Sequence, residues 1–245
     1  MVVYITSSPT GTYLKWDIKE FDGFNMANGM VREMKKDIGQ HVRCLVIAAA
    51  PDAYESNDRM TADFKERFED SGFIVDCIKI CDHRNHKKIL KDLSLFNFII
   101  LGGGHVPTQH AFFEEIMLRN KLKNYDGVVM GISAGSMNCA TTVYAQPEEE
   151  GESLIPSKKR FLKGLDLTPI MVLPHYNVVK DFMLDGKRLY EDITYPDSFE
   201  REFYAITDGS FILVRPDKTQ LRGEIYRLAD GELTLACKDG QIVYL

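Results

Sequence analysis

The segment Gly131-Ile132-Ser133-Ala134-Gly135 has the Gly-x-Ser-x-Gly spacing of a nucleophile elbow. The apolar run 128–132, which leads into this segment, predicts a short buried strand. The residues after the segment favour a helix. At such a turn the serine is held clear of the sheet in a strained conformation, while the glycines let other backbone and a substrate approach. Ser133 is therefore our candidate nucleophile. The alternative is that Ser133 only caps a helix between two packing glycines, and the motif alone favours neither.

A serine hydroxyl needs a histidine base, which an acid orients. His175 is the candidate base because it follows Pro174 at the end of an apolar run and is the only histidine C-terminal to Ser133. A structural histidine at a strand edge is the alternative. His41, His83 and His86 lie in polar surroundings, and we expect them at the surface. His110 lies within a predicted helix, where we expect it to be partly exposed, and His105 follows the glycine run 102–104.

The orienting acid is less sharply defined by the sequence. Asp208 lies where a short strand ends and a turn begins at Gly209, although Asp-Gly is also a common turn former. An α/β-hydrolase places the acid between serine and histidine, which would leave a long β-rich tail here. The order Ser133, His175, Asp208 agrees better with the β-rich segments that follow His175 in this chain. Four other carboxylates compete for this role: Asp166, Glu148, Glu150 and Asp181.

A second glycine-rich turn, Gly102-Gly103-Gly104, follows another apolar run. It either ends a strand tightly or supplies an oxyanion hole, in which the backbone N–H of Gly103 or Gly104 acts with that of Ala134. Each such donor can lower the barrier by ~3 kcal/mol. The run is neither G-x-G-x-x-G nor followed by GK[ST], so phosphate binding is weakly supported. No spacing resembles a metal site, and we expect no metal and no cofactor.

Short apolar runs alternate with helical patterns through the first half of the chain, which predicts βαβ units and a doubly wound, mainly parallel sheet with helices on both faces. Ligands of such sheets bind beyond the carboxyl ends of the strands, where both glycine turns fall. Turn signals after Tyr204 predict C-terminal antiparallel hairpins. We expect one α/β domain over 1–245. The predicted strands are 1–5, 42–50, 73–80, 96–101, 127–132 and 170–173, and the predicted helices are 25–38, a segment capped by Asn57, 86–93, a segment opened by Pro107, and 178–190.

Composition limits the classes of partner. The chain has 245 residues, of which 44% are hydrophobic and 27% charged, as in ordinary globular proteins. The net charge of −6 disfavours nucleic acid, and no apolar run has the length of a membrane span. Residues 1–5 lack the basic region of a signal peptide, and the five cysteines form no paired framework. We therefore expect a cytoplasmic protein with reduced cysteines. The oligomeric state is not fixed, and a homodimer is compatible with the sequence.

Three segments together resemble the peptidase E (aspartyl dipeptidase) family of serine peptidases, which is related to cyanophycinase. They are the glycine run 102–104, the segment Ser133-Ala134-Gly135 and Pro174-His175-Tyr176. The resemblance extends from the first strand to about Leu213. It implies a class I glutamine amidotransferase-like α/β fold and a Ser–His–acid triad with Ser133 as nucleophile and His175 as base. The acid of the family precedes a glycine, which matches Asp208, although the dipeptidase carries Glu there.

The resemblance is weaker for the substrate. His105 stands where the dipeptidase has Asn, and the family segment Thr-Arg-Glu-Gln-Arg is absent. The corresponding region, 184–190, offers Lys187 and Arg188, which with His105 are our candidate substrate-binding residues. Aspartyl specificity is not predicted. We expect a serine peptidase that cleaves a small peptide through an acyl-enzyme. The alternatives are an esterase or other α/β-hydrolase that uses the same serine, and a non-catalytic binding protein with this fold.

Overall fold

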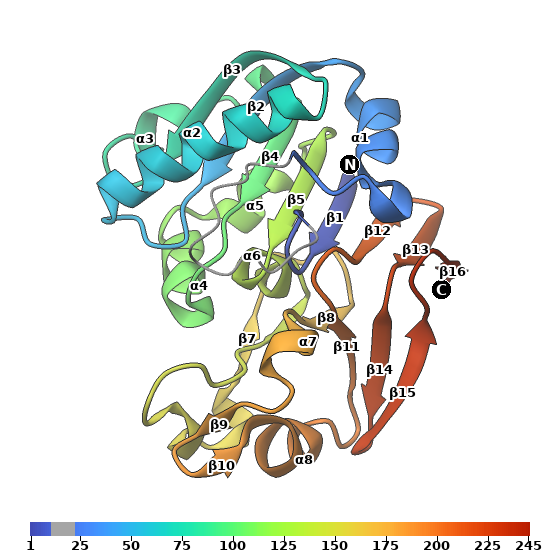
Figure 1. Ribbon diagram of the computed structural model, residues 1–245. Helices are drawn as coiled ribbons and strands as arrows, with labels where there is room; N and C mark the ends of the chain where they lie inside the picture. The colour runs from blue at the N-terminus through green and yellow to red at the C-terminus, as the bar shows by residue number, and fades with distance from the viewer. Residues whose placement is uncertain (11–22) are drawn as a thin grey trace.

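The computed structural model describes residues 1–10 and 23–245, and its central feature is an eight-stranded sheet (Figure 1). The strand order is β16-β13-β12-β1-β5-β4-β2-β3. The five strands from β1 to β3 in this order run parallel, and β12, β13 and β16 add to the edge antiparallel. The strands are β1 (Val2–Thr6), β2 (His41–Ile47), β3 (Ile74–Cys81), β4 (Phe98–Leu101), β5 (Val128–Ile132), β12 (Phe211–Arg215), β13 (Lys218–Arg222) and β16 (Ile242–Tyr244).

Helices cover both faces of this sheet, as the apolar runs predicted. Successive side chains of a strand point to opposite faces, so Val129 packs into one core cluster while Val128 and Met130 pack into the other. The first cluster contains side chains of α4 and α6, and the second contains side chains of α1 and α2. The helices of these layers are α1 (Met30–Ile38), α2 (Tyr54–Asp70), α3 (His86–Ile89), α4 (Val106–Glu115), α5 (Leu118–Leu122) and α6 (Ala134–Asn138).

A second sheet, β15-β14-β11-β8, lies below the first in Figure 1. β8 and β11 are parallel, and the other pairs are antiparallel. The hairpins β12–β13 and β14–β15 confirm the predicted C-terminal hairpins. The remaining strands and helices are β6 (Thr142–Tyr144), β7 (Phe161–Lys163), β8 (Met171–Leu173), α7 (Tyr176–Val179), β9 (Met183–Leu184), β10 (Lys187–Arg188), the π-helix Leu189–Thr194, α8 (Tyr195–Asp197), β11 (Glu202–Ile206), β14 (Ile225–Ala229) and β15 (Glu232–Cys237).

Two local predictions were wrong. The helix over 178–190 is replaced by the short α7, the hairpin β9–β10 and a π-helix. Asp185 and Gly186 form the hairpin turn with φ of 51° and 76°, a conformation that a helix cannot contain. Asn57 does not cap α2, which begins at Tyr54; its amide donates inward to the carbonyl of Ala50 (3.1 Å).

Among residues 1–10 and 23–245, no helix combines the length and the apolar character needed to cross a membrane.

Candidate active site

Ser133 occupies a strained turn between β5 and α6. Its φ of 51° and ψ of −115° lie in a region that side-chain-bearing residues rarely adopt. A Cβ at Gly131 would lie 2.6 Å from Ser136 Cα, and one at Gly135 would lie 2.2 Å from the Leu101 carbonyl oxygen. Only glycine therefore fits at either position, and the turn has the close packing that the Gly-x-Ser-x-Gly spacing predicts.

His175 and Asp208 are brought together by the parallel pairing of β8 with β11. Leu173 is opposite Ala205 in this pair, so both side chains lie just beyond the carboxyl ends of neighbouring strands. His175 Nδ1 is 2.7 Å from Asp208 Oδ1. The side chain of Asp208 is 1% exposed and that of His175 is 30% exposed. A buried carboxylate thus holds one ring nitrogen, which leaves Nε2 as the nitrogen available to a substrate or a serine.

A fourth residue, Ser7, joins this pair and was not singled out from the sequence. Its hydroxyl donates to Asp208 Oδ1 at 2.6 Å and accepts from the backbone N–H of His175 at 2.7 Å. Ser7 is fully buried and directly follows β1. The other carboxylate oxygen of Asp208, Oδ2, is buried and has no hydrogen-bond partner among the described residues. The carboxylate therefore directs a single oxygen to both Ser7 and His175.

Ser133 and His175 line one pocket with a volume of about 220 Å³. In the described part of the chain, no hydrogen bond joins the Ser133 hydroxyl to His175. Catalytic hydrogen bonds of this kind often tighten only when substrate is bound. The remaining walls of the pocket are Met137, Gln146, Pro147, Glu148, Pro174, Val179, Phe182 and Leu189.

The residues predicted for an oxyanion hole lie around Ser133. A Cβ at Gly103 would lie 3.5 Å from Ser133 Cβ, so the glycine run passes directly beside the serine. Ala134 is the first residue of α6, where a backbone N–H has no acceptor within the helix. At Gly104 a Cβ would lie 2.7 Å from Ala49 Cβ, which requires glycine there as well. Gly103 and Ala134 thus both border Ser133, and their role as oxyanion donors stays a prediction.

His105 anchors the loop 146–152. Its Nε2 lies 2.8 Å from Glu152 Oε1, while Glu152 Oε2 accepts from the backbone N–H groups of Glu148 (2.8 Å) and Glu149 (3.0 Å). This bonding fixes the loop beside the glycine run and places Glu148 in the wall of the pocket. His105, predicted to bind substrate, instead contacts the protein itself, and its role toward a substrate stays a prediction.

Glu148 is the perturbed carboxylate of this site. The residue is exposed as a whole, but its carboxyl group lies among protein atoms, and this burial raises the pKa of Glu148 to about 7. The nearby rings of His105 and His175 oppose the rise, and Glu152 reinforces it. Desolvation of a carboxylate in a cleft is a frequent property of functional sites.

The two predicted basic residues do not line this pocket. Lys187 Nζ lies 3.5 Å from the carbonyl oxygen of Ser153, and Arg188 forms an ion pair with Asp192. Their contact with a substrate carboxylate stays a prediction. Among the described residues, Asp208 is the carboxylate bonded to His175 Nδ1, and none of the four competing acids makes that contact. Glu148 lines the same pocket as His175. Asp166 is exposed and binds Arg119 and Thr141. Glu150 and Asp181 are also exposed.

One group of side chains has the geometry of a cation site. The ligand atoms of His105, Glu149 and Glu152 lie within 4.8 Å of one another. However, Glu152 is already engaged by His105 and two backbone N–H groups. A cation there would have to displace these hydrogen bonds.

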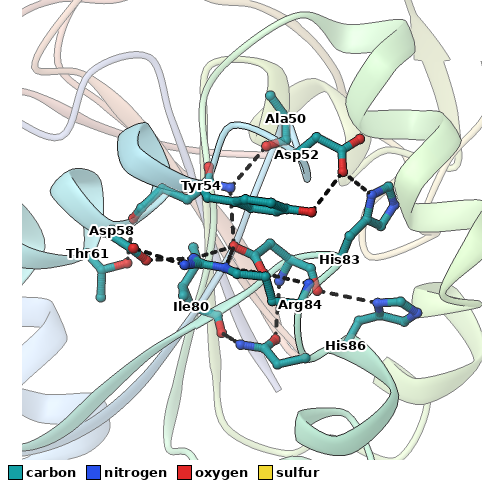
Figure 2. A network of polar contacts seen from close by, with 12 residues as sticks. Ala50, Asp52, Tyr54, Asp58, Thr61, Ile80, His83, Arg84 and His86 are labelled. Carbon is teal, nitrogen blue, oxygen red and sulfur yellow. Dashed lines mark hydrogen bonds and ion pairs between the residues drawn. The ribbon is translucent and has the colours of Figure 1, made fainter.

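A second polar cluster, which contains Arg84, Asp58 and Tyr54, lies at the ends of β2 and β3 (Figure 2). Asp82 is fully buried; both of its carboxylate oxygens lie 3.1 Å from Arg84 Nε, and Oδ2 also accepts from Arg84 Nη2 at 2.6 Å. Arg84 also binds both carboxylate oxygens of Asp58, and its guanidinium lies 4.8 Å from the ring centre of Tyr54. Arg84 therefore bridges the two carboxylates, and each of these three charged groups has an oppositely charged partner.

His83 extends this second cluster. Its Nδ1 lies 2.7 Å from Asp52 Oδ1, and its Nε2 lies 3.2 Å from Glu115 Oε2. The hydrogen bond to Asp52 is the main cause of a raised pKa of His83. With both ring nitrogens held by carboxylates, His83 has no nitrogen left to act as a base.

Comparisons with known proteins give the family and the fold of the chain. Residues 19–222 match the model of peptidase family S51. No curated protein matches the sequence. The fold is similar to the crystal structure of a provisionally assigned peptidase E protein from Listeria monocytogenes EGD-e, with 17% identity, a TM-score of 0.57, and coverage of 89% of this chain and 96% of that one. The family match covers most of the chain. The chain therefore belongs to peptidase family S51, the peptidase E family, and is a serine-type peptidase.

Proposed function

We propose that the protein hydrolyses an amide bond of a small peptide through a Ser133–His175–Asp208 triad and an acyl-enzyme. The observation that carries the proposal is the 2.7 Å contact between His175 and a buried Asp208, on a histidine that shares a pocket with the strained Ser133. Asp208 fixes the Nδ1–H tautomer of His175, so that Nε2 is free to take a proton.

In the first half of the reaction, the Ser133 hydroxyl oxygen attacks the carbonyl carbon of the scissile amide while His175 Nε2 takes the hydroxyl proton. The developing oxyanion receives hydrogen bonds from backbone N–H groups of Ala134 and of Gly103 or Gly104. His175 then gives the proton to the amide nitrogen. The C–N bond breaks, the amine leaves, and an ester joins the acyl group to Ser133.

In the second half, water attacks the ester carbonyl carbon and gives a proton to His175 Nε2. The bond between the acyl carbon and the Ser133 oxygen breaks, and the proton returns to Ser133. The products are one amine and one carboxylic acid, and the enzyme is restored. Asp208 stabilises the imidazolium that exists in both halves without itself being protonated.

The experiment that tests this function is the Ser133→Ala substitution. We expect the rate of peptide hydrolysis to fall by roughly 10⁴- to 10⁶-fold, because the nucleophile is removed. The thermal unfolding midpoint should stay near that of the wild type. A fluorophosphonate probe should label the wild type and leave the variant unlabelled. Hydrolysis that continues at the wild-type rate in Ser133→Ala would refute the mechanism.

A further inference from the structure

The walls of the pocket beside Ser133 are apolar apart from a few groups. Apolar side chains form most of the lining, and no lysine or arginine lines the pocket among the described residues. The amide of Gln146 is buried and donates to Thr194 Oγ1 at 2.8 Å, so it is committed to the protein. The apolar lining consists of Met137, Pro147, Pro174, Val179, Phe182 and Leu189.

Glu148 is the one carboxylate among the described residues that line this pocket. Its position is fixed by the backbone contact of its own N–H to Glu152, which His105 holds in turn. These contacts hold the backbone of Glu148 at the pocket, and Glu148 is one of the residues that line it. A carboxylate in a partly desolvated pocket attracts a cation and repels another anion.

The carbon that Ser133 attacks in a peptide is bonded to the Cα of the acyl residue. When that residue is the N-terminal one, the same Cα carries both the side chain and the α-ammonium group. A pocket that combines the serine, apolar walls and one carboxylate is complementary to such a residue. An aspartyl side chain would bring a second negative charge next to Glu148, without a basic partner in the described lining.

On the basis of the proposed function, we propose that the substrate is a short peptide with a free N-terminus and an apolar first residue, and that Glu148 determines this specificity by binding the α-ammonium group. The apolar walls hold the side chain of that residue. Binding uses the ionised form of Glu148. Its pKa of about 7 therefore implies that Glu148-dependent binding strengthens as the pH rises through 7. The charged groups that face Glu148 are His105, Glu149, Glu152 and His175.

Three matched peptides test the proposal: Leu-Ala, Asp-Ala and N-acetyl-Leu-Ala. We expect wild-type kcat/KM to be at least about tenfold higher for Leu-Ala than for either of the others, because acetylation removes the ammonium that Glu148 binds and an aspartyl side chain adds a negative charge beside Glu148. In Glu148→Gln the preference of Leu-Ala over N-acetyl-Leu-Ala should shrink toward one, mainly through a higher KM. In Glu148→Gln, kcat/KM for Leu-Ala should also depend less on pH near 7 than it does in the wild type.

The matched control is Glu150→Gln, which removes an exposed carboxylate from the same loop that does not line the pocket. This variant should keep the wild-type preference within about twofold, and thermal unfolding should show both variants folded. Faster cleavage of Asp-Ala, or equal cleavage of free and acetylated Leu-Ala by the wild type, overturns the specificity proposal. If such cleavage still requires Ser133, the proposed function survives; if no peptide is cleaved and Ser133 is not labelled, both proposals fail.

Discussion

Two polar clusters lie where parallel strands end: one follows β2 and β3 of the central sheet, and the other joins the end of β5 in that sheet to the ends of β8 and β11 in the second sheet. They differ in how completely their polar groups are bonded. The cluster after β2 and β3 pairs a buried Asp82 with Arg84 and binds both ring nitrogens of His83. The cluster after β5, β8 and β11 contains a strained Ser133 and a buried Asp208 with one unpartnered oxygen. Both clusters occupy the position at which ligands bind in sheets of this kind.

This difference shows that position in the fold does not by itself define an active site. In the first cluster each charged group already has protein partners, so a substrate would have to displace existing ion pairs. In the second, the protein leaves bonding capacity unused next to a pocket, at the expense of strain at Ser133 and one orphaned oxygen on Asp208. Strain and unused polar groups that persist in a folded protein are typical of functional sites.

The distinction between the two clusters would be contradicted most clearly if replacing Asp208 had no effect on catalysis. We expect Asp208→Asn to lower kcat by about 10⁴-fold, because an amide in place of the carboxylate favours the wrong tautomer of His175 and does not stabilise the imidazolium. The matched control is Asp166→Asn, which removes a carboxylate bound to Arg119 outside the pocket. Steady-state kinetics should show a change below about threefold for this control. The opposite ranking of the two variants would favour an esterase-type arrangement with the acid before His175.

Sequence patterns predicted the parallel half of the fold well because its strands are buried on both faces and read as continuous apolar runs. They also indicated Ser133, His175 and Asp208, since a motif, a strand end and a turn mark those positions. The region after α7 could not be read in this way. Mixed polarity over 178–190 was interpreted as a helix, whereas Asp185-Gly186 acts as a hairpin turn and a π-helix follows. The pairing of β8 with β11 brings Asp208 to His175. Local sequence patterns do not predict which strands pair, so the sequence left several acids as candidates.

We expect the cluster after β2 and β3 to contribute to the stability of the protein and not to its activity. Arg84→Met removes the main partner of the fully buried Asp82, and leaving a buried charge unpaired costs about 3–5 kcal/mol. We expect the thermal midpoint to fall by roughly 10 °C, with kcat unchanged at temperatures where the variant is folded. Arg227→Met is the control, because its ion pair with Glu202 is half exposed and contributes less than about 1 kcal/mol. A large loss of kcat in folded Arg84→Met would contradict the separation of the two clusters.

Ser7 provides the finest test of the comparison. It carried no signal in the sequence because a single serine has no spacing pattern, and its partners His175 and Asp208 lie 168 and 201 positions away along the chain. The end of β1 is next to that of β5 in the sheet, which is how Ser7 comes to lie beside the candidate triad. Among the described residues, Ser7 is not one of those that line the pocket beside Ser133. Its expected role is therefore to position Asp208 and His175.

We expect Ser7→Ala to lower kcat by about 10-fold with little change in KM, and to reduce the free energy of unfolding by about 1–3 kcal/mol, since the part-buried N–H of His175 and the buried Asp208 carboxylate both lose a hydrogen-bond partner. Ser8→Ala is the matched control, because that hydroxyl contacts Thr10 and neither triad residue. A purely structural Ser7 would give the same fold-loss of kcat in wild-type and Asp208→Asn backgrounds. A positioning Ser7 acts through the carboxylate, so the double variant should be little slower than Asp208→Asn alone.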